Sequence, residues 1–364
     1  MYNQLTEIKS RDSKLFWSTI DNIKNTKKTN HNPISITQWD TYFRGLLNSE
    51  NTPGNFPDIS SKIKDDSVLN APFNCKEIKQ ALATLKNKKS TGIDLIRNEF
   101  LKFGSSILVL PIVNFFNRIL QSGEFPVLWN ISNISVIHKN GSLHDCDNYR
   151  GISICSCLGK LFTKLLQNRV SNFLKDNNLI EDNQAGFKSD YRTTDQIFII
   201  KTIINKYLYK SKKPVFACFV DFTKAFDSVW REALFFKIQS LGIGGNIYNV
   251  IKSMYSNTYF CIKKDNYLSQ PVQNNLGVKQ GDSLSPTLFN IYINDFGDTL
   301  RSCKNTDPIG LGTKHLNHLL FADDLLLLSE SSTGLQKCIS QLEDYCEKWR
   351  LNVNLKKTKI MIFI

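Results

Sequence analysis

The spacing of apolar residues separates a polar N-terminal stretch from a longer region of helices and strands. Residues 1–70 are rich in Asn, Lys, Ser and Thr, with short helical patches such as Lys14–Lys24 and a Pro/Gly-containing break at Asn51–Asp58. Few apolar residues recur there at a regular interval, which is typical of segments outside a large core. We therefore interpret residues 1–70 as an accessory or linker region.

Apolar residues recur at helical spacing in several later segments. The predicted helix starts are Asn74 with Glu77, Ser285 with Pro286, and Thr333 with Gln336. The apolar stripes of the predicted helices are Ile78, Leu82 and Leu85; Leu161, Leu165 and Phe173; and Leu335, Cys338, Ile339, Leu342, Tyr345, Cys346 and Trp349. A further helix is predicted over Ser228–Leu241, because glycines follow at 242, 244 and 245.

Short apolar runs between these helices predict strands. The run PVFACFVD (Pro214–Asp221) is apolar and aromatic, Thr258–Gly277 reads as a hairpin region, and TKIMIFI (Thr358–Ile364) closes the chain as a strand. LLFADDLLLLSES (Leu319–Ser331) reads as a hairpin of two buried strands. Helices and strands in mixed order predict an α+β domain around an antiparallel sheet.

Two adjacent aspartates, Asp323 and Asp324, interrupt the apolar hairpin. A carboxylate without a partner in a low-dielectric core costs at least several kcal/mol, and the sequence has no lysine or arginine between Leu316 and Gln336. Asp221 also ends a buried strand, so two such strands side by side would bring the carboxylates together. Clustered carboxylates favour a divalent cation, and their hard oxygens suit Mg²⁺. The pattern therefore predicts a magnesium site that could hold the two ions of phosphoryl-transfer enzymes.

Composition narrows the class of protein. The formal charge of +13 favours a polyanionic partner, with a solvated lysine-rich surface as the alternative. Nine cysteines without a CxxC pair fit reduced thiols rather than a disulfide framework. The N-terminus has no apolar h-region, and no segment approaches the ~20 apolar residues of a membrane span. We expect an intracellular protein, in the nucleus, the cytoplasm or both, that does not bind membranes.

Three motifs resemble a known family closely. FVDFTKAFDSVW, QGDSLSPTLFNIYIND and FADDLLLLSES resemble, in this order and spacing, the three palm motifs of reverse transcriptases of LINE-like (non-LTR, Jockey/L1-type) retrotransposons. The flanking stretches resemble the finger and later palm motifs of the same family: LKNKKSTGIDLI, NYRGISICSCLGKLFTKLL, NQAGFKSDYRTTDQIF and WRLNVNLKKTKIMIF. The resemblance covers residues 70–364, with Ser283 and Lys188 as mild departures from the family pattern.

The resemblance implies a right-hand polymerase fold. Residues 71–213 would form the fingers with the first palm elements, and residues 214–364 the palm with an antiparallel sheet flanked by helices. The thumb would be largely absent, so we expect a truncated copy or a partial gene product. The implied activity is RNA-directed DNA polymerisation, with an RNA template, a DNA primer, a dNTP and two Mg²⁺ ions, for which Mn²⁺ is a substitute.

The resemblance also implies roles for single residues of the palm. Asp221, Asp323 and the main-chain carbonyl of Phe222 would bind the metal ions, and Asp324 would complete the metal-binding acidic pair, more through its charge than by direct ligation. Phe226 would pack against the sugar of the incoming nucleotide and exclude a 2′-hydroxyl; an ordinary core aromatic is the alternative. Lys357 is implied to protonate pyrophosphate, although Lys356 and Lys359 are its neighbours in the sequence.

In the finger segment, the resemblance implies that Lys139 and Arg150 bind the triphosphate. Arginine suits this role through its bidentate fork and lysine as a mobile point charge, whereas plain surface charge is the alternative for both. Gln280 and Gly281 would contact the template and nucleotide near the new base pair, where glycine permits a close backbone approach.

Two further interpretations of function stay open from the sequence. Within the enzyme class, a group II intron maturase or a viral RNA polymerase shares the palm chemistry. In a different class, the chain would be a catalytically inactive, truncated RNA-binding remnant of such an element. The oligomeric state is not indicated by the sequence.

Overall fold

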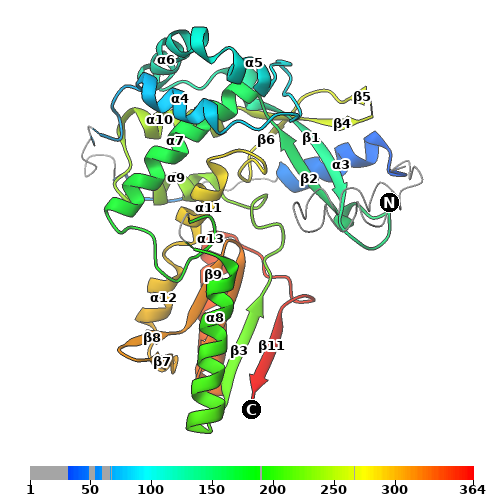
Figure 1. Cartoon of the computed structure of the whole chain (residues 1–364). Helices are drawn as coiled ribbons and strands as arrows, with labels where there is room; N and C mark the ends of the chain where they lie inside the picture. The colour runs from blue at the N-terminus through cyan, green and yellow to red at the C-terminus, as the bar shows by residue number, and fades with distance from the viewer. Residues whose placement is uncertain (1–31, 49–53, 60–65, 67, 189–190, 266) are drawn as a thin grey trace, which may run out of the picture.

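The computed structural model describes residues 32–48, 54–59, 66, 68–188, 191–265 and 267–364. The helical patches predicted around Lys14–Lys24 lie outside these residues. The described part contains two main β-sheets in separate places, with a group of helices beside them (Figure 1). The predicted α+β class with an antiparallel sheet is confirmed.

A group of helices packs around α7 and forms most of the largest core. Their bounds are α4 Cys75–Ala83, α5 Asn98–Phe103, α6 Ser105–Ser122, α7 Cys157–Asp176, α9 Arg231–Ser240, α10 Gly245–Ser256 and α11 Ser285–Ile293. The predicted start of α4 is confirmed, because Asn74 and Glu77 form a capping box. α7 begins after Ser156, whose hydroxyl accepts a hydrogen bond from Gly159 N–H at 3.0 Å, and it buries the predicted Leu161 and Leu165.

The first sheet has the strand order β2-β1-β4-β5, with β6 also paired to β4. Its elements and the short helices before them are η2 Val127–Asn130, β1 Ile131–His138, η3 Cys146–Asn148, β2 Tyr149–Ile154, β4 Thr258–Lys264, β5 Tyr267–Leu268 and β6 Val272–Asn274. β1 and β2 form an antiparallel hairpin, whereas β1 and β4 pair in parallel. The hairpin region predicted from Thr258 to Gly277 is therefore confirmed as antiparallel pairing of β4 with β5 and β6.

Helix α3 (Ile36–Leu47) covers one face of the first sheet. Its buried Trp39, Phe43 and Leu47 recur every four residues and pack with Phe260 and Tyr149 of that sheet. A capping box at Ser35 defines its start. This part of the region interpreted as accessory or linker is thus a packed element, while the domain boundaries at residues 70 and 213 stay predictions.

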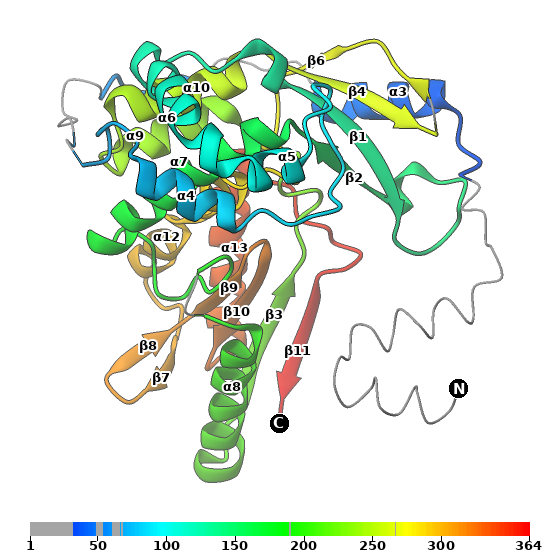
Figure 2. The same ribbon diagram turned by 45° about the horizontal axis from the view of Figure 1, so that its top comes forward.

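The second sheet has the order β11-β3-β10-β9, and all its pairs are antiparallel. Its strands are β3 Val215–Val220, β9 His318–Phe321, β10 Asp324–Ser329 and β11 Lys359–Phe363, which confirms each predicted strand. Helix α8 (Thr193–Ile204) and helix α13 (Ser332–Trp349) cover opposite faces (Figure 2). Ala217 and Leu326 face the α8 side, whereas Cys218 and Leu327 face the α13 side, as the period of two requires.

Two helix starts differ from the prediction. Ser285 is the first residue of α11 rather than its cap, and its hydroxyl lies 3.3 Å from the Tyr255 hydroxyl; Pro286 is in the first turn as predicted. The predicted capping box of Thr333 and Gln336 is wrong, because α13 begins two residues earlier. Ser331 caps this helix by accepting a hydrogen bond from Gly334 N–H at 2.9 Å. Because only two residues separate the end of β10 at Ser329 from the first residue of α13, Ser331 and not Thr333 lies at the start of the helix.

The remaining elements lie around the second sheet. They are η4 Asn205–Ser211, α12 Phe296–Ser302, β7 Ile309–Leu311 and β8 Lys314–Leu316. All nine cysteines are free thiols, in agreement with the sequence-based expectation. Within the described ranges, no helix combines the length and apolarity needed to cross a membrane.

Candidate active site

The three predicted carboxylates lie at one end of the second sheet. β9 and β10 are joined by a two-residue turn, Ala322 and Asp323, and Phe321 pairs with Asp324 across it. Leu325 of β10 pairs with Val220 of β3, so Asp324 and Asp221 are the next residues on neighbouring strands. Partial burial and the negative charges of Asp323 and Asp221 raise the pKa of Asp324. The sheet register thus brings together two carboxylates that are about 100 residues apart in sequence.

A loop before β11 holds the end of β3. Asn354 N–H donates to the Asp221 carbonyl at 2.7 Å, and Thr223 N–H donates to the Asn352 carbonyl at 2.7 Å. Phe222 forms a β-bridge with Val353 between these two bonds. In an antiparallel bridge of this kind, the N–H and C=O of the central residue point to the other side. The Phe222 carbonyl is therefore directed away from the β11 side of β3 and toward β10, where the paired aspartates lie.

A lysine side chain lies against Asp221. Lys357 Nζ is 3.6 Å from Asp221 Oδ2, and both side chains are partly exposed. Of the three neighbouring lysines, Lys357 is the one paired with Asp221, whereas Lys359 donates to the Lys356 carbonyl at 2.7 Å. An ammonium group already balances part of the negative charge at this end of the sheet.

The oxygen donors at this end of the sheet are of the kind that binds a divalent cation, although they do not surround a single ion position. In the part of the chain that the structure describes, no three His, Cys, Asp or Glu side chains are arranged around one ion position. The carboxylates of Asp221, Asp323 and Asp324 nevertheless interact, since their charges raise the pKa of Asp324. These hard oxygen donors, with the Phe222 carbonyl on the same side, are those that Mg²⁺ prefers.

Several cationic side chains lie within electrostatic reach of Lys357, the lysine paired with Asp221. Lys139 follows β1, and its N–H donates to the Asn148 carbonyl at 2.8 Å, while Arg150 lies in β2 opposite Ile137. Partial burial and the positive charges of Arg150, Lys357 and Lys224 lower the pKa of Lys139. The two predicted phosphate-binding cations therefore share one region with Lys357, and Lys224 is an additional cation that the sequence analysis did not assign.

Gln280 and Gly281 connect the site to the first sheet. Gln280 Nε2 donates to Asp227 Oδ2 at 3.1 Å, and the Gln280 carbonyl accepts from Ser153 N–H at 2.8 Å. Gly281 has φ +113°, and a Cβ there would meet the Ser153 carbonyl oxygen at 2.8 Å. Glycine is thus required by the approach of this loop to β2, whereas contacts with template and nucleotide stay a prediction.

Asp227 is a half-buried carboxylate among these cations, and the sequence analysis gave it no role. Burial raises its pKa to about 6, although Lys224, the Gln280 amide, Lys139 and Arg150 act in the opposite direction. The motif FDSVW around it was recognised only as part of a family resemblance. Its low-dielectric position next to Gln280 could be found only from the packed structure.

We expect the substitution Asp227→Asn to stabilise the protein in a pH-dependent manner. The folded-state pKa of about 6 lies above the ordinary value of 3.8, so the folded protein binds the extra proton between these pH values. As pH rises from about 4 to 6, the free energy of unfolding therefore decreases in the wild type but not in the variant. Urea denaturation should show that the free energy of unfolding of the variant exceeds that of the wild type by about 1–3 kcal/mol at pH 7, and that this difference disappears near pH 4. A gap independent of pH would contradict the burial of an ionised Asp227.

Phe226 lies between two other aromatic rings. It stacks on Phe289 of α11 with centroids 4.7 Å apart, and its ring is edge-on to Phe187 at 6.2 Å. The Phe226 carbonyl also accepts a hydrogen bond at 2.8 Å from the N–H of Val278, two residues before Gln280. The half-buried ring is held rigidly five residues after Asp221. Its contact with a nucleotide sugar stays a prediction.

Helix α3 reaches this site, which the sequence analysis did not foresee. The Tyr42 hydroxyl donates to Asp147 Oδ1 at 2.9 Å, and Lys224 Nζ contacts both Tyr42 Oη and, at 2.6 Å, Asp147 Oδ1. The Lys224 ammonium is also 4.5 Å from the centre of the Tyr42 ring. These contacts join the β1–β2 connection to the turn after β3. The recurrence of Trp39, Phe43 and Leu47 was the signal that could have predicted a packed helix here.

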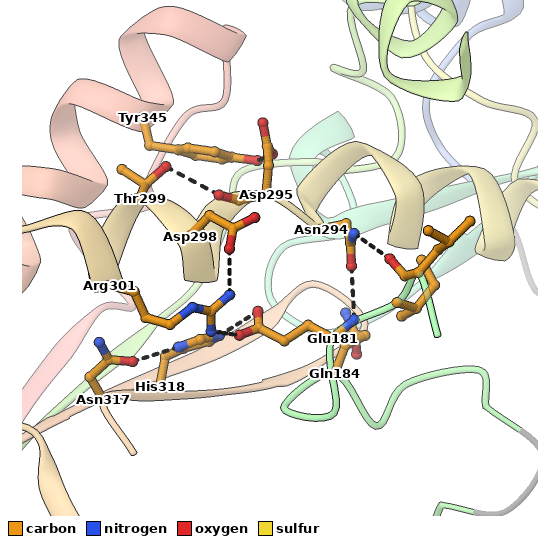
Figure 3. Close-up of polar contacts among 12 residues, drawn as sticks. Glu181, Gln184, Asn294, Asp295, Asp298, Thr299, Arg301, Asn317, His318 and Tyr345 are labelled. Atoms are coloured by element: carbon orange, nitrogen blue, oxygen red, sulfur yellow. Dashed lines mark hydrogen bonds and ion pairs between the residues drawn. The ribbon is translucent and has the colours of Figure 1, made fainter. Parts of the chain in front are cut away.

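A second polar cluster supports the start of β9. Glu181 Oε2 lies 3.1 Å from His318 Nε2, and its other oxygen pairs with Arg301 (Figure 3). His318 is fully buried, with Nδ1 at 2.8 Å from Asn317 Oδ1. These cationic and histidine contacts lower the pKa of Glu181 against the opposing effect of its burial. The cluster ties residue 181 to the strand that leads into the Asp323 turn.

Comparisons with known proteins give the family of most of the chain. Residues 137–362 match the family described as "Reverse transcriptase (RNA-dependent DNA polymerase)". The chain is 32% identical to a probable RNA-directed DNA polymerase from transposon BS of Drosophila melanogaster, over 79% of this chain and 32% of that protein. It is 27% identical to the RNA-directed DNA polymerase from mobile element jockey of the same species, over 88% of this chain and 36% of that protein.

The chain also has more distant similarities. A Pol polyprotein from the type-1 retrotransposable element R2 of Popillia japonica is 28% identical over 67% of this chain and 34% of that protein. Among solved structures, a telomerase from Candida tropicalis matches with a TM-score of 0.49 and 17% identity, over 71% of this chain and 45% of that one. The chain spans about a third of the length of the curated relatives named here.

The family match and the relatives confirm the resemblance drawn from the motifs, including its non-LTR character. The matched residues include the β1–β2 connection, β2, β3, the β9–β10 turn and most of β11, which together carry the carboxylates and the cations described above. The chain belongs to the reverse transcriptase (RNA-dependent DNA polymerase) family.

Proposed function

We propose that this chain is the RNA-directed DNA polymerase of a non-LTR retrotransposon, which transfers a nucleotide from a dNTP to the 3′-hydroxyl of a primer. The observation that carries the proposal is the meeting of Asp221, Asp323 and Asp324 at one end of the second sheet. Lys357 lies against Asp221, and the charges of Lys357 and Arg150 act on Lys139, which links these cations to the carboxylates. A negative metal-binding end and a positive phosphate-binding region are the two parts that such a transfer needs.

Asp221, Asp323 and the Phe222 carbonyl are proposed to hold two Mg²⁺ ions, with Asp324 adding charge. Enzymes of this family generally use divalent metal ions; when bound, they would activate the primer hydroxyl and neutralise charge on the leaving pyrophosphate. Mn²⁺ as a substitute stays a prediction. The ion pair between Lys357 and Asp221 is partly exposed and therefore weak, so it would not prevent Asp221 from binding a cation.

The remaining residues bind and orient the substrates in this proposal. Arg150 and Lys139 bind the triphosphate, and Gln280 and Gly281 lie by the new base pair. Phe226, fixed by Phe289, faces the sugar and disfavours a ribonucleotide. Lys357 gives a proton to the leaving pyrophosphate. Electrostatic stabilisation and positioning are the main contributions expected for phosphoryl transfer.

The proposed nucleic-acid partners are an RNA template and a DNA primer. The formal charge of +13 supports a polyanionic partner. A nuclear or cytoplasmic location stays a prediction. No feature of the site within the described residues favours the inactive alternative, because each predicted metal-binding carboxylate lies at the same sheet end.

Primer extension tests the proposal. The natural chain, with an RNA template, a DNA primer and Mg²⁺, should extend the primer with dNTPs, whereas Asp323→Ala plus Asp324→Ala should not. Both proteins should bind RNA equally, with a log-log salt slope of roughly 0.7–0.9 per phosphate contacted. If the natural chain binds RNA but extends no primer under any metal condition, the inactive alternative is correct.

A further inference from the structure

A buried glutamine side chain contacts the turn that carries Asp323. Gln184 is 2% exposed, and its Oε1 accepts hydrogen bonds from Ala322 N–H at 3.0 Å and Gly186 N–H at 2.7 Å. Its Nε2 donates to the Ala322 carbonyl at 3.2 Å. One side chain therefore binds both main-chain polar groups of the residue that directly precedes Asp323. Because the Ala322 N–H is a donor and the Ala322 carbonyl is an acceptor, the Gln184 amide satisfies both in only one of its two flipped orientations.

The turn needs such a partner for a physical reason. Ala322 has φ +60°, a left-handed conformation that residues with a Cβ rarely adopt, and it is 7% exposed. It lies between the two strands, so its N–H and C=O are outside the β9–β10 ladder. Buried main-chain groups without partners are strongly unfavourable. Gln184 supplies these partners and so favours this turn conformation over others.

Gln184 is itself held firmly. Its segment runs beside β9 with Ala185 N–H donating to the Leu320 carbonyl at 2.9 Å and Leu320 N–H donating to the Asn183 carbonyl at 2.9 Å. A Cβ at Gly186 would lie 2.0 Å from Ala322 N, so glycine allows the segment to touch the turn. Asn290 of α11 also donates to the Gly186 carbonyl at 2.8 Å. The main chain on both sides of Gln184 is thus held in place where its side chain contacts Ala322.

The opposite end of this segment offers an internal comparison. Asn294 Oδ1 accepts from Glu181 N–H at 3.0 Å, and its Nδ2 donates to the Leu179 carbonyl at 2.8 Å (Figure 3). Asn294 therefore holds the same segment through two main-chain hydrogen bonds, as Gln184 holds the turn. In contrast to Gln184, the Asn294 side chain bonds to the main chain of residues 179 and 181 rather than to Ala322.

We propose that Gln184 is a positioning residue of the nucleotidyl-transfer site. By fixing the Ala322 peptide, it holds the Asp323 carboxylate where Asp323 and Asp221 can bind the same metal ion. The inference rests on the proposed function, because it assigns Asp323 to metal binding. In this proposal Gln184 acts through the turn, because its side chain is buried against the main chain of Ala322 and Gly186.

The test compares Gln184→Met, which keeps most of the side-chain volume, with the matched control Asn294→Leu. For each protein we would measure kcat and KM for a dNTP, the Mg²⁺ concentration for half-maximal rate, and hydrogen–deuterium exchange of peptides containing residues 319–325. We expect Gln184→Met to lower kcat by roughly 10- to 100-fold, as a misplacement of about 1 Å does. KM should change less than about 3-fold, the Mg²⁺ requirement should rise, and exchange around Ala322 should accelerate.

Asn294→Leu should lower Tm while it leaves kcat and the Mg²⁺ requirement near the wild-type values. Equal losses of kcat in both variants, or unchanged exchange around Ala322 in Gln184→Met, would overturn the proposal. If Gln184→Met does not fold, Gln184→Glu replaces it, because Glu keeps the two acceptor bonds but loses the donation to the Ala322 carbonyl. Its kcat should still fall about 10-fold at unchanged KM; a wild-type kcat would contradict the positioning role.

Failure of the proposed function gives a different result. In that case the natural chain extends no primer, while the exchange difference between Gln184→Met and Asn294→Leu still reports whether Gln184 fixes the turn. Exchange that is equally fast in both variants would overturn the inference independently of any polymerase activity.

Discussion

Asp221→Asn is expected to lower the rate of nucleotide addition by about 10³-fold or more. Asparagine keeps the shape of the side chain but removes the negative charge that a divalent ion needs, and preorganised charge is the largest contribution to catalysis of this kind. Because Asp221 lies beside Asp324 in the sheet register, the loss also leaves the paired aspartates without their partner on β3. Single-turnover primer extension in Mg²⁺ measures the effect.

The fold and the affinity for RNA should be nearly unchanged in this variant. The ion pair with Lys357 is partly exposed, and such pairs contribute at most ~1 kcal/mol. Removal of one of three interacting carboxylates also relieves repulsion. Asp344→Asn, on the exposed side of α13, is the matched control and should keep full activity. An Asp221→Asn protein that extends primers at the wild-type rate would contradict the assignment of Asp221.

Phe226→Val should allow the enzyme to use ribonucleotides. The preference for a dNTP over the matching rNTP, taken as the ratio of kcat/KM values, should fall about 10- to 100-fold, because a smaller side chain leaves room for the 2′-hydroxyl. The stacking on Phe289 and the edge contact with Phe187 hold the aromatic ring in place, so a steric effect is expected. Steady-state incorporation of single dNTPs and rNTPs measures the ratio.

Phe226→Tyr is the control for this prediction, because it keeps the ring and should retain the preference for dNTPs. Phe226→Val also loses packing against Phe289, and a lower Tm is expected in any case. If Tm falls while the preference stays unchanged, Phe226 is an ordinary core aromatic.

Much of the sheet that carries the site could be predicted from sequence. The apolar runs that form β3, β9, β10 and β11 can be recognised because each is short and bounded by polar residues, although β11 turns out to be mostly exposed. The aspartates at their ends stood out because a charge beside such a run is unfavourable without a cation. Local signals therefore located the carboxylates, and the family resemblance supplied their roles.

Features that depend on distant contacts could not be predicted in this way. The parallel pairing of β1 with β4 joins strands more than 100 residues apart, and no local pattern specifies it. The same holds for Lys224, whose partners come from α3 and the β1–β2 connection. Gln184 reads as an ordinary polar residue until the segment beside β9 brings it to Ala322. The cap of α13 was misplaced by two residues because several hydroxyl residues adjoin it.

Metal binding to the assembled complex tests the central claim most directly, namely that Asp221 and Asp323 hold the catalytic metal ions. Mn²⁺ binding would be followed by electron paramagnetic resonance in a complex of the chain with an RNA template, a dideoxy-terminated primer and the matching dNTP. We predict two tightly bound ions in the natural chain and in Asp344→Asn, and a loss of tight binding in both Asp221→Asn and Asp323→Asn. Tight Mn²⁺ binding that is unchanged by both active-site substitutions would contradict the claim.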